Sequence, residues 1–224
     1  MARLELSFLG PFQVRLEGRP VTSFEADKVR ALLVYLAVEA SRPHRREQLA
    51  SLFWPGWPDA SARTSLRNAL SNLRSAIRDD SADPPFLLIT RETIQFNPAS
   101  DHRLDQAELE RMSTGSADAD QLQSALALYR GSFLEGFTLK DCPAFDDWSY
   151  VVKEGLQTKV STVFNQLATI FGRIGNTKKP LDVPADGLPS SPGRKTPTAN
   201  SCACWPSAVS ARLPWRSSRP ASVR

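Results

Sequence analysis

Apolar and polar residues alternate at the start of the chain, and the pattern then changes to a helical period. Residues 4–8 carry leucine or phenylalanine at every second position, and residues 12–16 repeat this alternation after a Gly-Pro pair. A period of two predicts two short strands that each bury one face. From Asp27 to Val38, apolar residues recur at spacings of three and four. This spacing predicts a largely buried helix.

Two more helices follow, separated by a run rich in tryptophan and proline. Ser41 and Pro43 are typical start signals for a short second helix, which we expect to end at the Trp-Pro-Gly-Trp-Pro run of residues 54–58. Asp59 is a good N-cap for a third helix that continues to Arg78. Its buried face is predicted by an apolar stripe at helical spacing, formed by Leu66, Leu70, Leu73 and Ile77.

A β-hairpin closes this first region. Segments 86–90 and 93–97 alternate in polarity and are separated by Arg91-Glu92, which is the pattern of two strands joined by a turn. Two strands, three helices and a hairpin, in this order, predict a winged helix-turn-helix over residues 1–100.

The second region is predicted to be helical. After a polar connection at residues 101–116, a helix around Leu122 ends at Gly131, a natural left-handed stop. Apolar residues at spacings of three, four and seven then predict a long helix over residues 143–171. Such helices stack as tetratricopeptide-like hairpins, and one hairpin cannot bury its apolar face alone. We therefore predict a mainly α fold with a small β component, a winged helix-turn-helix followed by an incomplete tetratricopeptide-like α-helical domain over residues 101–172.

Composition and charge narrow the classes of function. No apolar run among the 224 residues approaches the length of about 20 that a membrane span needs, and no signal-peptide pattern occurs, so we expect a cytoplasmic protein. The net charge of +4 is not evidence for an acidic partner such as nucleic acid. Residues 173–224 carry nine Lys or Arg and two Asp, which leaves a net charge of −3 on residues 1–172. The three cysteines match neither a zinc site nor a disulfide framework. We expect no metal and no cofactor.

The outer face of the third helix is the main candidate for a binding site. At about 100° per residue, a row of polar residues lies opposite the leucine stripe: Thr64, Asn68, Ser71 and Ser75. Arg67, Arg74 and Arg78 flank this row, and the segment from Ala60 to Arg78 contains no acid. Asparagine can pair with adenine and arginine with guanine in the major groove, while hydroxyls and outer arginines take phosphates. The pattern predicts contact with double-stranded DNA, although an ordinary solvated helix face is the simpler alternative.

Two neighbouring segments extend this predicted interface. Arg91 and Thr93, at the hairpin tip, could reach a phosphate or the minor groove, although charged hairpin tips are often just solvated. A basic cluster precedes the second helix, where side chains and backbone amides could hold a phosphate: Arg42, His44, Arg45 and Arg46. Of these we select Arg45 as a DNA contact, and we expect His44 to be an exposed turn residue.

Several stretches of the chain resemble the antibiotic-regulatory-protein (SARP) family of bacterial transcriptional activators. They are LELSFLGPFQV, KVRALLVYLAVEASRPHRREQLASLFWP and ARTSLRNALSNLRSAI, followed by ALALYRGSFLEGF and DCPAFDDWSYVVKEGL. The resemblance covers residues 3 to about 172. The combination of these stretches in one order is more specific than any single motif.

This resemblance implies a fold, a function and partners. It implies an OmpR-like winged helix that binds promoter direct repeats, and a bacterial transcriptional activator domain (BTAD). The helix that carries Arg63, Thr64, Arg67, Asn68 and Ser71 would be the recognition helix, and RNA polymerase would be a partner. Self-association on DNA is a further expectation. Larger relatives add an ATPase module, but no GxxxxGK[ST] motif occurs in this sequence.

The resemblance stops after Gly175. Residues 173–224 hold eight of the 17 prolines and no glutamate, so they are not expected to form helices. One interpretation is a disordered basic tail that adds nonspecific DNA affinity. The other is a frameshift, because the genetic code permits residues 195–220 to hide a helical hairpin in another reading frame. Without further helices, we expect the apolar face of segment 148–171 to lack burial and proteolysis to leave a core that ends near residue 100 or 172.

Three alternatives to a DNA-binding activator remain. The chain could be a protein-interaction module that lacks DNA binding, or an inactive remnant that binds DNA without activating transcription. An enzyme is the third alternative, with Asp146 and Asp147 as acid and base. Adjacent residues on a helix point in different directions, however, and Ser, His and Cys form no nucleophile constellation. We therefore expect no catalytic activity.

Overall fold

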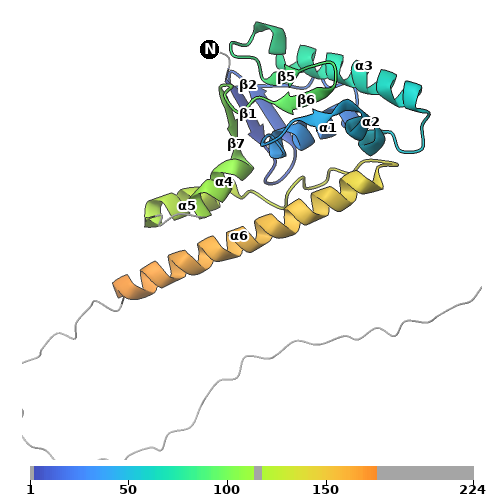
Figure 1. Ribbon diagram of the computed structural model, residues 1–224. Helices are drawn as coiled ribbons and strands as arrows, with labels where there is room; N and C mark the ends of the chain where they lie inside the picture. Colours follow the sequence, from blue (N-terminus) through green and yellow to red (C-terminus); the bar gives the residue numbers. More distant parts are fainter. Residues whose placement is uncertain (1–2, 114–117, 176–224) are drawn as a thin grey trace, which may run out of the picture. The chain divides into compact units, whose positions relative to one another are not determined.

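The computed structural model describes residues 3–113 and 118–175, with side chains up to Phe171. The fold is mostly helical with a small sheet component (Figure 1). The strands are β1 (Leu4–Ser7), β2 (Gln13–Leu16), β3 (Arg19–Pro20), β4 (His44–Arg45), β5 (Leu87–Ile89), β6 (Thr93–Phe96) and β7 (His102–Leu104). The helices are α1 (Asp27–Val38), α2 (Arg46–Phe53), α3 (Asp59–Ile77), α4 (Asp105–Ser113), α5 (Ala119–Leu128) and α6 (Pro143–Gly175), with a 3₁₀ turn η1 (Asp79–Ser81) after α3. Residues 176–224, which include the segment of the frameshift hypothesis, lie outside the described residues.

The strands form two small sheets. In the first, of order β3-β2-β1-β7, β1 pairs antiparallel with β2, with Leu6 opposite Val14. The predicted alternation is confirmed, because the apolar residues of both strands are buried. In the second, of order β4-β6-β5, the predicted hairpin β5-β6 is joined by β4, where His44 lies opposite Ile94.

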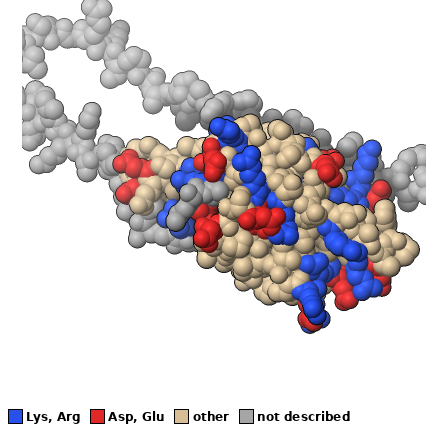
Figure 2. Space-filling model, turned by 90° about the horizontal axis from the view of Figure 1, so that it is seen from above, with Lys and Arg blue, Asp and Glu red and all other residues tan. Residues whose placement is uncertain are grey.

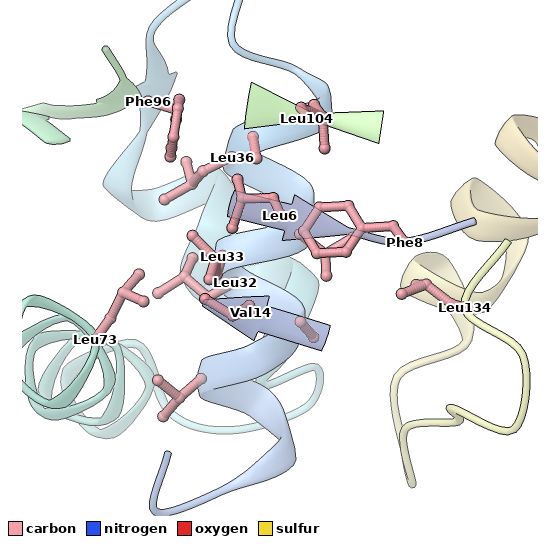
Figure 3. Close-up of a cluster of buried hydrophobic side chains, with 14 of the residues drawn as sticks. Leu6, Phe8, Val14, Leu32, Leu33, Leu36, Leu73, Phe96, Leu104 and Leu134 are labelled. Atoms are coloured by element: carbon pink, nitrogen blue, oxygen red, sulfur yellow. The ribbon is translucent and has the colours of Figure 1, made fainter. Parts of the chain in front are cut away.

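Helix α1 lies at the centre of the core of the first region. Its Leu32, Leu33 and Leu36 are fully buried, and they lie near Leu6 of the first sheet and Leu73 of α3 (Figure 3). The predicted stripe of α3 is confirmed, since all four of its residues are buried. Burial of one such side chain is worth about 1.5 to 3 kcal/mol, so the stripe fixes which face of α3 turns outward.

Helices α4, α5 and α6 pack on one another, and the start of α6 packs on the first region. Leu156, Val163 and Leu167 of α6 are buried. The expectation that segment 148–171 would lack burial is therefore wrong for this face, because α4 and α5 cover it. Up to Phe171, the large apolar residues that stay exposed on α6 are Tyr150, Val151, Phe164 and Phe171.

Aromatic side chains join α6 to α1 and α2. The ring centroid of Phe145 lies 5.7 Å from that of Phe53, and Trp148 lies 4.9 Å from Tyr35. The indole Nε1 of Trp148 donates to Glu39 Oε1 at 3.1 Å. The first turn of α6 is thus fixed to the two helices that precede α3.

A buried carboxylate joins β1 to α4. Asp105 accepts hydrogen bonds from the backbone amides of Phe8 and Leu9, each at 2.9 Å, and from that of Gln106 at 2.8 Å. Arg130 approaches the same carboxylate at 3.7 Å. Burial raises the pKa of Asp105 above its usual value, and the amide donors and Arg130 offset part of this rise.

The expected polar connection at residues 101–116 is wrong over its first part. Residues 102–104 form β7, which pairs parallel with β1, and residues 105–113 form α4. The elements that follow residue 100 therefore complete the first sheet. The proposed boundary between a domain of residues 1–100 and one of residues 101–172 is crossed by these backbone hydrogen bonds.

Smaller differences concern His44 and the helix ends. His44 is only 4% exposed, lies in β4 and contacts the Glu39 carbonyl through Nε2 at 3.1 Å, so it is not an exposed turn residue. Helix α3 has Pro58, and not Asp59, at its N-cap position. Helix α5 ends at Leu128 with Tyr129 as an extended C-cap, so Gly131 is not its stop.

Candidate nucleic-acid interface

The polar row predicted on α3 lies on the outside of the molecule. Thr64, Asn68, Ser71 and Ser75 are all exposed, opposite the buried stripe. Arg78 continues the row as the C-cap of the helix, in a left-handed conformation with φ of 53°. The spacings along residues 64, 68, 71 and 75 are four, three and four, which places these residues in one line along the helix, and Arg78 follows three residues later at the C-cap. We name this row the outer stripe.

The arginines near the start of α3 have only weak internal partners. Arg63 is exposed, and its guanidinium lies 3.7 Å from Glu47 of α2. Arg67 is also exposed, and its Nη2 lies 3.5 Å from the hydroxyl of Thr64, which itself donates to the Ala60 carbonyl. Exposed pairs of this kind are worth about 0 to 1 kcal/mol, so an external phosphate or base can replace them.

Arg74 differs from the other arginines of α3. Its Nε donates to the buried carboxylate of Asp79 at 3.3 Å, and its Nη2 forms an ion pair with Asp80. Asp79 also accepts from the backbone amide of Leu87 at 3.0 Å, at the start of the hairpin. Arg74 thus connects the end of α3 to η1 and β5, and it stands apart from the residues at the start of the helix.

The hairpin places Arg91 and Thr93 at different depths. Arg91 is exposed at the tip, whereas Thr93 is half-buried. The hydroxyls of Thr90 and Thr93 lie 2.9 Å apart within the turn. Arg45 of β4 lies opposite Thr93 in the sheet and is exposed, so Arg45 lies on the strand next to β6, which begins two residues after Arg91.

Short contacts join this sheet to the start of α3. The Nε of Arg46 donates to the Thr90 carbonyl at 3.0 Å, which holds the hairpin against the start of α2. The next residue, Glu47, contacts Arg63. The structure therefore brings Arg45, Arg63 and the hairpin together on one side. Arg46 was not selected from the sequence, because its backbone contact depends on the hairpin returning to α2.

Charge on the face seen in Figure 2 is mixed. Lys and Arg side chains lie interspersed with Asp and Glu, and they do not form a field of one sign. This face therefore lacks the field of one sign that attracts anions over a distance. Within residues 3–113 and 118–171, no group of three or more His, Cys, Asp or Glu is arranged to hold a metal ion. None of the described helices combines the length and apolarity that a lipid bilayer crossing requires.

Comparisons with known proteins identify mycobacterial relatives. No family model matches the chain. The transcriptional regulatory protein EmbR of Mycobacterium tuberculosis, and that of Mycobacterium bovis, are 36% identical to the chain over 86 residues, which is 38% of this chain and 22% of each relative. The structure of M. tuberculosis EmbR in complex with a low-affinity phosphopeptide matches with a TM-score of 0.55 at 22% identity, over 79% of this chain and 50% of that one.

These matches show a shared fold and a partial homology. The matched segment spans about a fifth of the EmbR sequence, so EmbR contains much that this comparison leaves unmatched. The name of this relative is that of a transcriptional regulatory protein. Over the matched 86 residues the chain is homologous to EmbR, and most of its length has the fold seen in the EmbR structure.

Proposed function

We propose that the chain is a sequence-specific DNA-binding transcriptional regulator. One observation carries this proposal: the outer stripe of α3 and its flanking arginines are exposed, while the opposite face is buried. In this proposal α1, α2, α3 and the hairpin form an OmpR-like winged helix-turn-helix, with α3 as the recognition helix. Homology to a protein named as a transcriptional regulator supports this assignment.

The residues of the interface take different roles. Arg67 and Asn68, in the middle of the exposed face, would read base edges, because their side chains can make bidentate pairs with guanine and adenine. Arg45, Arg63 and Arg91 would bind phosphates on the side of the hairpin. Thr64, Ser71 and Thr93 would add hydroxyl contacts, with Thr93 limited by its bond within the turn. Arg74, bound by Asp79 and Asp80, would mainly position the helix.

The remaining helices would serve activation. By resemblance to SARP-family activators, α4, α5 and α6 would form an incomplete tetratricopeptide-like activator domain (BTAD) that engages RNA polymerase at promoter direct repeats. Self-association on adjacent repeats fits this mode of binding. A regulator of this kind acts on chromosomal DNA and would therefore be cytoplasmic.

The test is selection of bound sequences from random DNA with the full chain, followed by binding measurements on the selected site. We expect a repeated motif. Arg67→Glu should weaken binding at least tenfold, because it replaces a base or phosphate contact by a repulsive charge. The matched control is Arg15→Glu, an equal change of charge at an exposed residue of β2, which should have a small effect. Binding with no sequence preference and no dependence on Arg67 would refute the proposal.

A second candidate function has an observation of its own. Four large apolar residues of α6 are exposed, and such a surface is typical of a protein-protein contact. In this alternative the chain is a protein-interaction module, or a remnant that binds promoters without activating. Operator selection followed by a reporter assay separates the remnant from the interaction module. A remnant would occupy the operator and leave transcription unchanged. An interaction module would bind no operator.

A further inference from the structure

A hollow lies at the far end of the outer stripe, between the C-terminal end of α3 and the turn from β2 to β3. Its volume is about 270 Å³. Two arginines and three hydroxyl side chains line it: Arg19, Arg78, Thr22, Ser23 and Ser75. Glu17 lines it as well. Two guanidinium groups and several hydroxyls have the chemistry of a site for a single phosphate group, which the carboxylate of Glu17 opposes.

The two arginines of this hollow pair with no acid among residues 3–113 and 118–171. Among the described residues, neither Arg19 nor Arg78 forms an ion pair, and both are exposed. Arg74, one turn before Arg78, is by contrast held by two aspartates. Asp79 and Asp80, the two acids that directly follow Arg78, thus pair with Arg74, which leaves the charge of Arg78 available to an external anion.

The hollow continues the proposed DNA-binding surface. Ser75 and Arg78 belong both to the outer stripe and to the lining of the hollow. From Thr64 to Arg78 the stripe extends over 14 residues, or about 21 Å at 1.5 Å per residue. The major groove is about 12 Å wide, so a helix that reads bases near Arg67 and Asn68 carries its other end to the phosphates at the groove edge.

We propose that Arg19 and Arg78 form a binding site for one phosphodiester of the DNA backbone, at the end of α3 opposite the one that carries Arg63. This inference rests on the proposed function. Together with the hairpin side, the site would fix the position of α3 across the groove. Arg45 and Arg91 would bind one DNA strand, and Arg19 and Arg78 would bind the other. Such contacts set register and orientation without reading sequence.

The test measures the affinity of the full chain for its selected site over a series of salt concentrations. Each phosphate contact contributes about 0.9 to the slope of log K against log salt. The double variant Arg19→Ala with Arg78→Ala should lower the slope by about 0.9 and leave the selected motif unchanged. Arg19→Lys with Arg78→Lys should keep the slope, and Glu17→Gln should tighten binding. Arg15→Ala, an exposed arginine of β2 outside the hollow, is the matched control.

A second measurement locates the phosphate on the DNA. Neutral methylphosphonate linkages are placed one at a time along the site, and one linkage should weaken wild-type binding but not binding of the double alanine variant. An unchanged salt slope for that variant, with Arg67→Glu still disruptive, would overturn this inference alone. Binding of inorganic phosphate that the double alanine substitution abolishes, together with an unchanged salt slope for DNA, would show a free-anion site and also overturn it. Absence of any sequence-specific binding by the wild type would refute the proposed function itself.

Discussion

The two regions of the molecule bury their apolar residues in different ways. In residues 4–104, α1 packs against α3 and β6, its leucines lie near the first sheet, and seven of its residues are buried. In residues 105–171, the long helix α6 is covered by α4 and α5 on one face only. On its other side Tyr150, Phe164 and Phe171 are 62%, 58% and 49% exposed. The first region has a closed core, whereas the second is open on one side.

The open region also depends on the closed one. Phe145 and Trp148, near the start of α6, pack against Phe53 and Tyr35, and Cys142, just before the helix, contacts the Phe53 carbonyl. Strand β7 and Asp105 complete the first sheet from the other direction. The first region is therefore not independent of the second, because each contributes to the core of the other. Cutting between them should damage both.

The largest expected effect comes from ending the chain after residue 100. This removes β7, the carboxylate that binds the amides of Phe8 and Leu9, and the cover that Phe145 gives to Phe53. Each large side chain uncovered costs about 1.5 to 3 kcal/mol, and the stability of a small domain is only about 5 to 15 kcal/mol. We expect residues 1–100 to lose cooperative unfolding in urea, while residues 1–175 retain it. A stable, cooperative fragment of residues 1–100 would contradict the shared core.

The next effect comes from one aromatic ring at the joint. Phe145 is 1% exposed, and Phe145→Ala should lower the free energy of unfolding by about 3 to 5 kcal/mol, as expected for a large-to-small change in a core. Both regions should unfold together at a lower urea concentration. Phe164→Ala, the same change on the exposed face of the same helix, is the control and should cost less than about 0.5 kcal/mol. Equal effects of the two variants would mean that α6 is not anchored at its start.

Asp105→Ala tests the polar part of the joint. The change leaves three buried amides without an acceptor, and a buried unsatisfied group costs about 1 to 3 kcal/mol, so we expect a loss of about 3 kcal/mol. Asp101→Ala, at an exposed residue four positions earlier, should be nearly neutral.

The same substitution tests the titration of Asp105. Because burial raises the pKa of this carboxyl in the folded chain, the native state keeps its proton to a higher pH than the unfolded state does. The resulting stability is complete below the unfolded pKa of about 3.9 and is lost as pH rises through the folded pKa. The stability difference between wild type and Asp105→Ala should therefore shrink as pH rises from about 4. A difference that grows with pH would show that the amides and Arg130 outweigh burial.

The sequence pattern predicted those elements that are long enough for their period to repeat. The stripe of α3 and the alternation of the hairpin each repeat several times within one element, so they could be recognised without knowledge of the fold. Strand β4 has two residues, too few for any period, and its partner β6 lies about 50 residues away. This explains why the burial of His44 could not be predicted. Asp105 and its polar neighbours resemble a solvated loop until β1 supplies amide donors.

Prediction of the candidate site from the sequence was also limited to features that lie within one element. Exposure of Thr64, Asn68 and Ser71 followed from helical geometry alone. The pairing of Arg74 with Asp79 did not, because it depends on how the chain turns after Arg78. Arg19 carried no signal as a binding residue. It meets Arg78 only because the turn from β2 to β3 lies beside the end of α3.

The smallest of these effects concerns a single hydrogen bond between the regions. Trp148→Phe keeps an aromatic ring against Tyr35 but removes the indole N–H that donates to Glu39. A hydrogen bond to a charged group is worth about 1.5 to 3 kcal/mol, and Glu39 retains Arg42 as a partner, so we expect a loss near the lower end, about 1.5 kcal/mol. Trp57→Phe, at a tryptophan that is 53% exposed, is the matched control and should change the urea midpoint little. In a double-mutant cycle, Glu39→Gln should weaken the effect of Trp148→Phe, because an amide oxygen is a poorer acceptor than a carboxylate. Additive effects of the two substitutions would mean that the open region is held to the closed one by ring packing alone.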